Sequence, residues 1–413
     1  MSRLSSPARE FLREIVSHYW ESHDFNGIPL DHLSHRRPGD AINIVEELVQ
    51  RRLVEINSGR WDNPYIKRVP LPAVNIQLAE LRMGNFVCLY PSTRYLKRVI
   101  PRRLYRNKPF TRLLASGHPQ LEPMFFELNV LNRYQSDARY SFQFWGLNGS
   151  ISLTQKYYRS REVPTADKVL VETFGLASNA KGQRLVAVFL RYLTRLSARH
   201  QGYWNSHRVA QRGCRVEYNY YHRSIFGEWT AGISVYTALL DELGRINKLC
   251  QVIGWPHLFR KDLSGEPPKG FGLLMNTTKR EYLNFAHLLD KVISENLNYA
   301  FFAELHISLV DEANERKGTL TLLQEWLTQE IHVEHDDAAA ILAPLRRTRK
   351  VRQPTAHSIV DDEFSHRYQK LKEELIKDVY AAIRRIRELL QTHPRATRYE
   401  IKREPQLNDI VVY

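Results

Sequence analysis

Cysteine is scarce in this chain of 413 residues, and its three cysteines, Cys88, Cys214 and Cys250, are far apart. No two of them form a Cys-x-x-Cys pair. Disulfide frameworks and cysteine-rich zinc sites need more cysteines or a closer spacing. We therefore expect buried thiols, with neither cross-links nor a zinc site made from cysteine.

Long apolar runs are missing as well. A stretch such as 185–190 has the length of a strand, whereas a membrane helix needs roughly 18 apolar residues. The opening stretch MSRLSSPAREFLREIV has acidic residues and an amphipathic pattern where a signal peptide has a plain apolar core. These patterns predict a cytoplasmic protein with no membrane partner.

Acidic residues are absent from two long intervals. One lies between Glu80 and Glu122, and the other runs from Thr173 to Val216. Both are rich in arginine with aromatic residues interleaved. Because cations neutralise phosphates and flat rings stack on unpaired bases, this mixture is typical of proteins that bind single-stranded nucleic acid. The alternative interpretation is a core of aromatic residues with arginines at its solvated edge.

The whole chain carries a formal net charge of +15, which predicts a polyanionic partner. The interleaved aromatic residues make a single-stranded nucleic acid the expected partner. In the first acid-free interval, the residues predicted to bind RNA are Arg98, Arg102, Arg103 and Arg106.

The first part of the chain, residues 5–68, begins with two predicted helices. The first extends from about Pro7 to Glu21, with a cap at Ser5-Ser6 and an apolar stripe along one side. The second begins at Asp40, a residue type that caps helices well. Two amphipathic helices in succession predict a small helical core.

A strand is predicted next, at 53–56, followed by a turn at 57–59 and a returning strand at 65–68. This order of elements, two helices followed by a strand, a turn and a returning strand, resembles a winged helix-turn-helix module. Such modules bind DNA in some proteins and serve as protein contacts in others. We therefore keep both uses open for this part of the chain.

The rest of the chain divides into a mixed region and a helical region. Residues 70–277 are basic and rich in strand patterns, with a hairpin predicted around Asn148-Gly149 and a helix at 234–250. From residue 278 onward, four amphipathic helices with short links imply an antiparallel bundle. The predicted fold class is multidomain α+β, with a winged-helix-like module (1–69), a mixed α/β domain (70–277), a helical bundle (278–394) and a C-terminal arm (395–413).

One stretch of the predicted bundle, RRTRKVRQPTAHSI at 346–359, combines a basic cluster with a proline and a histidine. Arg352 precedes His357 by five positions. A similar Arg–His spacing occurs elsewhere in this arginine-rich chain, for example at Arg13/His18 and Arg387/His393. Only Arg352/His357 lies at a break between two predicted bundle helices and inside a basic cluster, so context selects this pair.

This arrangement, Arg352-Gln353-Pro354-Thr355-Ala356-His357 before a last long helix, resembles the HEPN superfamily. Its ribonucleases carry an arginine followed, after four to six residues, by a histidine. The resemblance covers roughly residues 278–394, and Gln353 departs from the Asn, Asp or His that is common after the arginine. It implies a metal-independent endoribonuclease that acts as a homodimer with a composite cleft. It also implies a conditional role, as a toxin or an anti-phage defence effector, with an inhibitory or activating protein partner.

The chemistry of RNA cleavage suits these residues. Without a metal or other cofactor, a group that titrates near neutrality must move the proton of the 2′-hydroxyl, and we assign this role to His357. A fixed cation must stabilise the pentavalent phosphate, and we assign this role to Arg352. Gln353 is expected to orient one of them. The residues predicted to hold the RNA backbone here are Arg346, Arg347, Arg349 and Lys350.

The principal alternative is a regulator whose winged helix binds DNA and whose bundle only dimerises. In that case the residues that contact DNA would be Arg51, Arg52 and Lys67. A second alternative is a metal site, because metal-ligand types gather at His332, Glu334, His335 and Asp336. An acidic, solvated helix start explains the same four residues more simply.

Overall fold

The computed structural model describes residues 4–22, 24–35, 39–68, 70–101, 103–228, 232–264, 267–272, 275–352, 361–400 and 409–411. The chain divides into two compact units. The N-terminal unit comprises Met1–Val130, Asp137–Ser141 and Ser150–Phe226, and the C-terminal unit comprises Leu131–Ser136, Phe142–Gly149 and Gly227–Tyr413. Antiparallel sheets dominate the first unit and helices the second, so the mixed class of helices and strands and the helical C-terminal region are confirmed.

The N-terminal unit begins with helices that form as predicted. Helix α1 (Ser6–Glu21) starts after Ser5, whose hydroxyl accepts a hydrogen bond from the Ala8 amide at 3.2 Å. Helix α3 (Ala41–Gln50) starts after Asp40, although the Asp40 side chain makes no capping hydrogen bond. The buried faces of both helices belong to one apolar core.

A small antiparallel sheet with the order β1-β3-β2 packs into this core. The elements around it are β1 (Ile28–Pro29), α2 (Leu30–Ser34), β2 (Val54–Ser58), α4 (Val74–Arg82) and β3 (Val87–Pro91). The returning strand predicted at 65–68 is wrong, and β3 pairs with β2 instead. The Asn57 side chain explains the difference, because its amide lies 3.1–3.2 Å from three loop carbonyls, among them that of Ile66.

A larger antiparallel sheet follows, with the order β5-β6-β7-β8-β4-β9, while β10 pairs with β7. Its strands are β4 (Pro123–Glu127), β5 (Tyr140–Phe144), β6 (Asn148–Leu153), β7 (Leu170–Ser178), β8 (Arg184–Phe189), β9 (Arg208–Val209) and β10 (Arg215–Val216). The accompanying helices are α5 (Thr93–Val99), α6 (Pro109–Ala115), α7 (Asn132–Ser136), α8 (Gln155–Tyr158), α9 (Leu190–Thr194), α10 (Ala198–Ser206) and α11 (Tyr218–Phe226).

Neighbouring residues of β4 face opposite sides of this sheet. Phe126 makes edge-to-face contacts with Phe110 and Trp204 on one side. Phe125 belongs to the core on the other side, which α11 covers with Tyr220. Because Gly175 in β7 has no side chain, Tyr220 can pack directly on the strand; a Cβ atom at this position would lie 1.9 Å from the Tyr220 ring.

The predicted hairpin between β5 and β6 exists, but its turn precedes Asn148-Gly149. The Trp145 amide donates a hydrogen bond to the Asn148 carbonyl at 2.8 Å, so the turn centres on Gly146 and Leu147. Gly146 has a φ of +88°, a conformation that glycine adopts without strain. Asn148-Gly149 therefore begins β6 rather than forming the turn.

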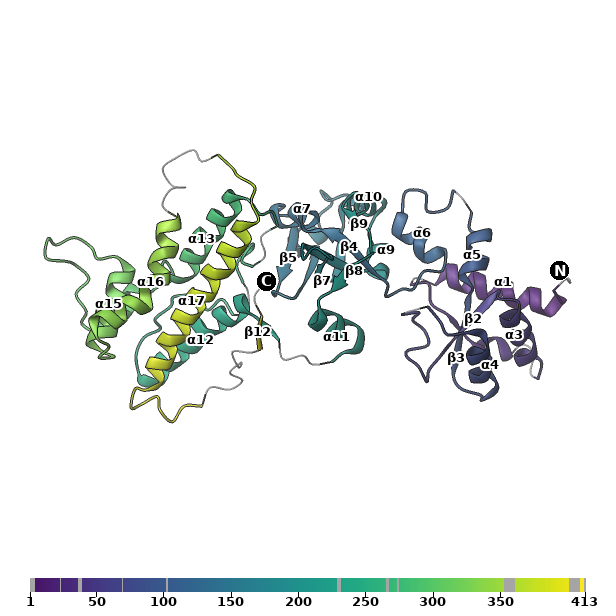
Figure 1. Ribbon diagram of the computed structural model, residues 1–413, viewed down its shortest axis with the longest axis horizontal. Helices are drawn as coiled ribbons and strands as arrows, with labels where there is room; N and C mark the ends of the chain where they lie inside the picture. The colour runs from purple at the N-terminus through teal and green to yellow at the C-terminus, as the bar shows by residue number, and fades with distance from the viewer. Residues whose placement is uncertain are drawn as a thin grey trace. The chain divides into compact units, whose positions relative to one another are not determined.

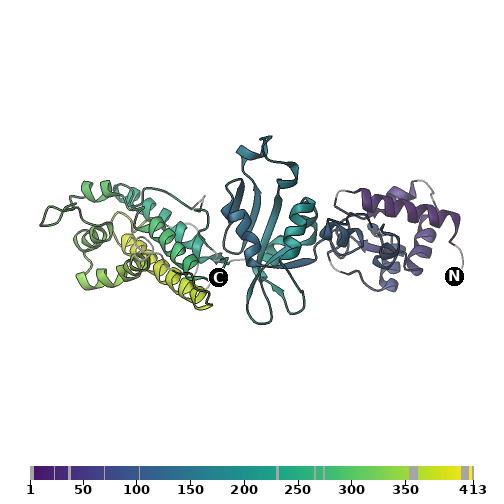
Figure 2. The same cartoon turned by 90° about the horizontal axis from the view of Figure 1, so that it is seen from above.

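The C-terminal unit is a helical assembly around one extended apolar core. Its helices are α12 (Val235–Ile253), α13 (Lys279–Ile293), α14 (Tyr299–Glu304), α15 (Thr319–Gln329), α16 (His335–Arg352) and α17 (Arg367–Gln391). In Figure 1 and Figure 2 the yellow helix α17 lies alongside α12, and α16 packs between α13 and α15. The predicted boundary at residue 277 would separate α12 from the helices whose core it shares.

Two short strands, β11 (Ile233–Ser234) and β12 (Ile410–Val411), pair in parallel at the start of α12. Ser234 also caps α12, since its hydroxyl accepts a hydrogen bond from the Tyr236 amide at 3.1 Å. Within the ranges given above, no helix combines the length and the apolar character needed to cross a membrane.

A buried ion pair joins α17 to α12. Arg387 is 2% exposed and donates to Glu242, which is fully buried, at 2.9 Å. Arg245 also contacts Glu242, at 2.7 Å. Removing the cation from such a pair leaves a buried carboxylate whose lost hydration is no longer offset by a neighbouring positive charge. This strongly destabilises the folded protein.

We expect Arg387→Ala to lower the free energy of unfolding by about 3–5 kcal/mol, because Glu242 then loses its most deeply buried partner. The control is Arg385→Ala, on an exposed side chain two residues earlier in α17, which we expect to change stability by less than about 0.5 kcal/mol. Urea unfolding measured by circular dichroism compares the two variants. Equal stability of both variants would contradict the prediction.

Candidate functional site

Helix α16 sets the position of the predicted catalytic arginine. Asp336 and Asp337 lie in its first turn, where the helix dipole favours negative charge. Arg352 is its last residue, at the end where the dipole favours positive charge. Pro344 lies inside the helix without ending it, and the Thr348 hydroxyl donates to the Pro344 carbonyl at 2.9 Å.

The guanidinium of Arg352 is held by two carboxylates. Its Nη1 lies 2.5 Å from Oδ2 of Asp290 on α13 and also bonds Oε1 of Glu295, which follows α13. Burial opposes the charged form of Arg352, but the hydrogen bonds to Asp290 and Glu295 outweigh burial and raise its pKa. The side chain keeps 30% of its surface exposed, so the group is oriented without being enclosed.

Asp290 is the most buried member of this cluster, at 1% exposure. Its Oδ1 atom lies 3.7 Å from Nε of Arg349 and makes no hydrogen bond within the part of the chain that the structure describes. Arg349 in turn donates to the Thr319 hydroxyl of α15 at 3.1 Å. Asp290 therefore links α13 to two successive cations on α16.

His287 lies one helical turn before Asp290 on the same helix. It is half-buried, and its pKa is lowered from the ordinary value of 6.5, first by burial and then by the positive charges of Lys291 and Arg352. The sequence analysis identified neither His287 nor the two carboxylates. An available signal was the charged Asp290 beside Leu289 in the apolar stripe of this helix.

Two of the three residues predicted to be catalytic, Gln353 and His357, lie outside the described residues. Arg352 is described, and it is brought together with Asp290 and Glu295. Both carboxylates come from a segment about 60 residues earlier in the chain.

The basic residues of α16 that were predicted to hold RNA differ in their surroundings. Arg346 bonds the Gln324 side chain and Arg347 bonds Asp378 at 2.7 Å, while Arg349 contacts Asp290. Lys350 is exposed and makes no ion pair with any described residue. Three of these four cations thus already have partners within the unit.

The predicted RNA-binding residues of the N-terminal unit are more accessible. Arg98 lies in the last turn of α5, and Arg103 and Arg106 lie in the turns after it; all three are exposed. None of the three makes an ion pair within the described ranges. Arg102 lies outside those ranges.

The residues predicted to contact DNA have mixed exposure. Lys67 is 5% exposed, and its ammonium lies 2.6 Å from the Glu55 carboxylate. Arg51 pairs with Glu47 one turn earlier in α3 at 3.0 Å, and Arg52 is exposed in the turn before β2, with a φ of +57°. Lys67 is therefore part of the internal structure of this module.

The segment considered for a metal lies at the start of α16. His332, Glu334 and His335 border a shallow hollow, and the side chains of His335 and Asp336 are exposed. Among the residues that the structure describes, no three His, Cys, Asp or Glu side chains are grouped so that they could hold a metal ion. The acidic helix start accounts for this segment.

Comparisons with known proteins give no match. No protein-family model, no curated protein and no solved structure matches this chain.

The cluster around Arg352 predicts a change in the titration of His287. Arg352→Ala removes a positive charge that disfavours protonated His287. The negative charges of Asp290 and Glu295, which favour protonated His287, remain, so we expect the pKa of His287 to rise. A histidine NMR titration, assigned with His287→Gln, measures this pKa, and Arg347→Ala is the matched control. An unchanged or lower pKa of His287 in Arg352→Ala would contradict the prediction.

The lowered pKa also affects stability. Because protonated His287 is disfavoured in the folded state relative to the unfolded chain, its contribution to the free energy of unfolding is lost as the pH falls below about 6.5. Urea unfolding at several pH values should therefore show a loss in this range that is smaller in His287→Gln.

Proposed function

We propose that this protein is a metal-independent endoribonuclease of the HEPN type, with its site where α16 ends. The observation that carries the proposal is the held guanidinium of Arg352, at the last residue of a helix in a helical unit, with two carboxylates fixing its direction. A cation that is oriented before substrate arrives stabilises charge on a phosphate without reorganising.

The reaction proceeds by attack of the ribose 2′-oxygen on the adjacent phosphorus. A bond from the 2′-oxygen to phosphorus forms, and the bond from phosphorus to the 5′-oxygen breaks. His357 carries out one of the two proton transfers, taking the proton of the 2′-hydroxyl or supplying a proton to the leaving 5′-oxygen, and solvent carries out the other. Arg352 balances the charge of the pentavalent phosphate. The products are a 2′,3′-cyclic phosphate and a 5′-hydroxyl. Gln353 orients one of the two groups.

The proposal includes a homodimer, in which two copies of the motif share one composite cleft. Each protomer has a mass of 48.5 kDa, so light scattering should give about twice this mass. Exposed Lys350 and the arginines at 98, 103 and 106 are available to phosphates of the RNA. A conditional role as a toxin or an anti-phage defence effector, controlled by a protein partner, belongs to the same proposal.

The DNA-binding regulator is the weaker of the two functions. One of its three proposed contacts, Lys67, has its ammonium enclosed beside Glu55 rather than presented to a groove. Reading DNA requires basic side chains that reach the phosphates or the base edges. Of the other two, Arg51 pairs with Glu47, and only Arg52 is exposed with no ion pair among the described residues.

The test is incubation of the purified protein with total RNA in EDTA, followed by mapping of the fragment ends. We expect the parent protein to leave cyclic phosphates. Removing the acid or base in His357→Ala should lower the cleavage rate by roughly 10²–10⁴-fold, and Arg352→Ala by roughly 10²–10³-fold. RNA affinity of His357→Ala should stay close to that of the parent.

The matched controls are His366→Ala and Arg385→Ala, which alter exposed side chains of the same types in the same unit. Both should cleave at the parent rate. Lack of cleavage by the parent, fragments with 3′-hydroxyl ends, or equal rates in His357→Ala and His366→Ala would each contradict the proposal.

A further inference from the structure

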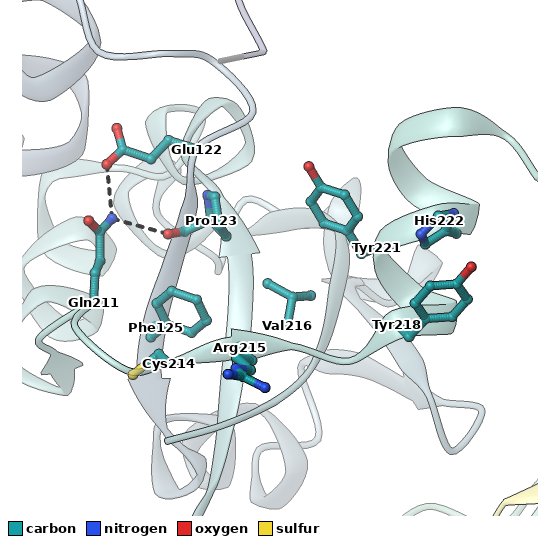
Figure 3. A pocket seen from close by; sticks show the side chains of 10 residues that line it. All are labelled: Glu122, Pro123, Phe125, Gln211, Cys214, Arg215, Val216, Tyr218, Tyr221 and His222. Carbon is teal, nitrogen blue, oxygen red and sulfur yellow. Dashed lines mark hydrogen bonds between the residues drawn. The ribbon is translucent and has the colours of Figure 1, made fainter. Parts of the chain in front are cut away.

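The N-terminal unit contains a pocket that the proposed nuclease site does not use. Strand β9 pairs with β4 whereas β10 pairs with β7, so the link 210–214 passes across the larger sheet. Next to this link lies a hollow of about 480 Å³, with Phe125 and Val216 in its wall (Figure 3). This volume falls within the range of ordinary ligand sites, roughly 300–1,000 Å³.

One side of the pocket is made of aromatic rings from α11. Tyr218, His222 and Phe226 follow each other at intervals of four residues, which places them on one face of the helix. Their ring centroids are 4.0 and 5.2 Å apart, with interplanar angles of 30° and 32°. The Arg68 guanidinium lies 4.5 Å from the Phe226 ring and extends this column. The rings therefore already form a close, tilted column before any ligand binds.

Tyr218 is the accessible end of the column, with 66% of its surface exposed. Figure 3 shows it together with Tyr221 and His222 at one side of the pocket. An exposed, ordered tyrosine next to an apolar hollow offers a planar surface on which an unpaired base can stack, whatever the base.

The opposite side of the pocket is polar. The Gln211 amide donates to Oε1 of Glu122 at 2.9 Å and to the Pro123 carbonyl at 3.2 Å (Figure 3). Burial alone would raise the pKa of Glu122, but hydrogen bonds from His118 and Gln211 outweigh burial and lower it. A carboxylate therefore lies on the side opposite the rings, with its oxygens bonded to Gln211 and His118. Carboxylate oxygens can each accept a second hydrogen bond, such as one from an exocyclic amino group of a base.

Positive charge surrounds the entrance. Arg215 lines the pocket and Arg212 precedes it by three residues; both are exposed and make no ion pair within the described ranges. Arg208 lies near enough to Glu122 to lower its pKa. Cations beside a stacking surface can neutralise the phosphate attached to the stacked nucleotide.

We propose that this pocket binds a base of a single-stranded RNA, stacked against Tyr218, with Arg215 on the adjacent phosphate. A strand is favoured over a free nucleotide because Arg212 and Arg208 precede Arg215 in the chain, so cations are available to more than one phosphate. Arg212, on the link and in the second acid-free interval, is proposed to contact the next phosphate of the strand. This inference does not depend on cleavage at Arg352.

The experiment uses the full chain and a fluorescent 2′-O-methyl RNA of about eight nucleotides, which lacks the free hydroxyl needed for cleavage. Fluorescence anisotropy gives the affinity. We expect Tyr218→Ala to weaken binding roughly 5- to 150-fold, as loss of one base stack does, and Tyr218→Phe to bind as the parent does. Tyr158→Ala is the matched control, because Tyr158 is 65% exposed and lies outside the pocket.

The salt dependence tests the phosphate contact. Arg215→Ala should reduce the slope of log affinity against log salt by about 0.7, the value for one phosphate of a single strand. Arg159→Ala, at an exposed arginine outside the pocket, should leave the slope unchanged. An unchanged slope in Arg215→Ala would overturn the assignment of this residue.

Cys214 locates the ligand independently, since it lines the pocket while Cys88 and Cys250 are buried. Bound RNA should slow alkylation of Cys214 by a small maleimide, and Tyr218→Ala should abolish this protection. The proposal is overturned if Tyr218→Ala binds as tightly as Tyr158→Ala. It is also overturned if a mononucleotide or a duplex competes as well as the single strand.

Discussion

A carboxylate with 1% of its surface exposed, as Asp290 has, must be matched by a nearby cation, because an isolated charge in the interior is strongly unfavourable. In the C-terminal unit this cation is Arg352, with Arg349 one turn earlier. Apolar side chains on α13 and α16 tolerate small shifts of one helix along the other. The carboxylate instead favours the arrangement that brings both guanidinium groups toward it, so it fixes how the last turn of α16 lies against α13.

Much of the fold follows from local patterns, and the exceptions come from distant contacts. Helices α1, α12, α16 and α17 were predicted because caps, periodicity and terminal charges lie within each segment. The segment 65–68 has the composition of a strand, yet the Asn57 side chain bonds carbonyls of a loop that includes Ile66, and β3 pairs with β2 instead. The stripe on α12 predicted a buried face but could not indicate that its neighbour would be α17, more than a hundred residues later.

The candidate site shows the same division. The position of Arg352 at a helix end was predictable, since spacing and a basic cluster mark it. The two carboxylates that bind Arg352 could not be predicted, because Asp290 and Glu295 belong to another segment and nothing in their local sequence links them to α16. The aromatic column of α11 could be predicted only in part. Its interval of four residues is visible in the sequence, but only the fold places Glu122 and Gln211 on the other side of the pocket.

Pro344 gives α16 an uneven stiffness along its length. A proline inside a helix removes one backbone hydrogen bond and crowds the preceding turn, which makes this the place where the helix bends most easily. Arg352 lies eight residues after Pro344, about 12 Å along the helix axis, at the end of the segment that begins at the proline. Because Asp290 and Glu295 bond the guanidinium at that end, drawing Arg352 toward a phosphate would leave Arg349 as the remaining ion-pair partner of the buried carboxylate among the described residues.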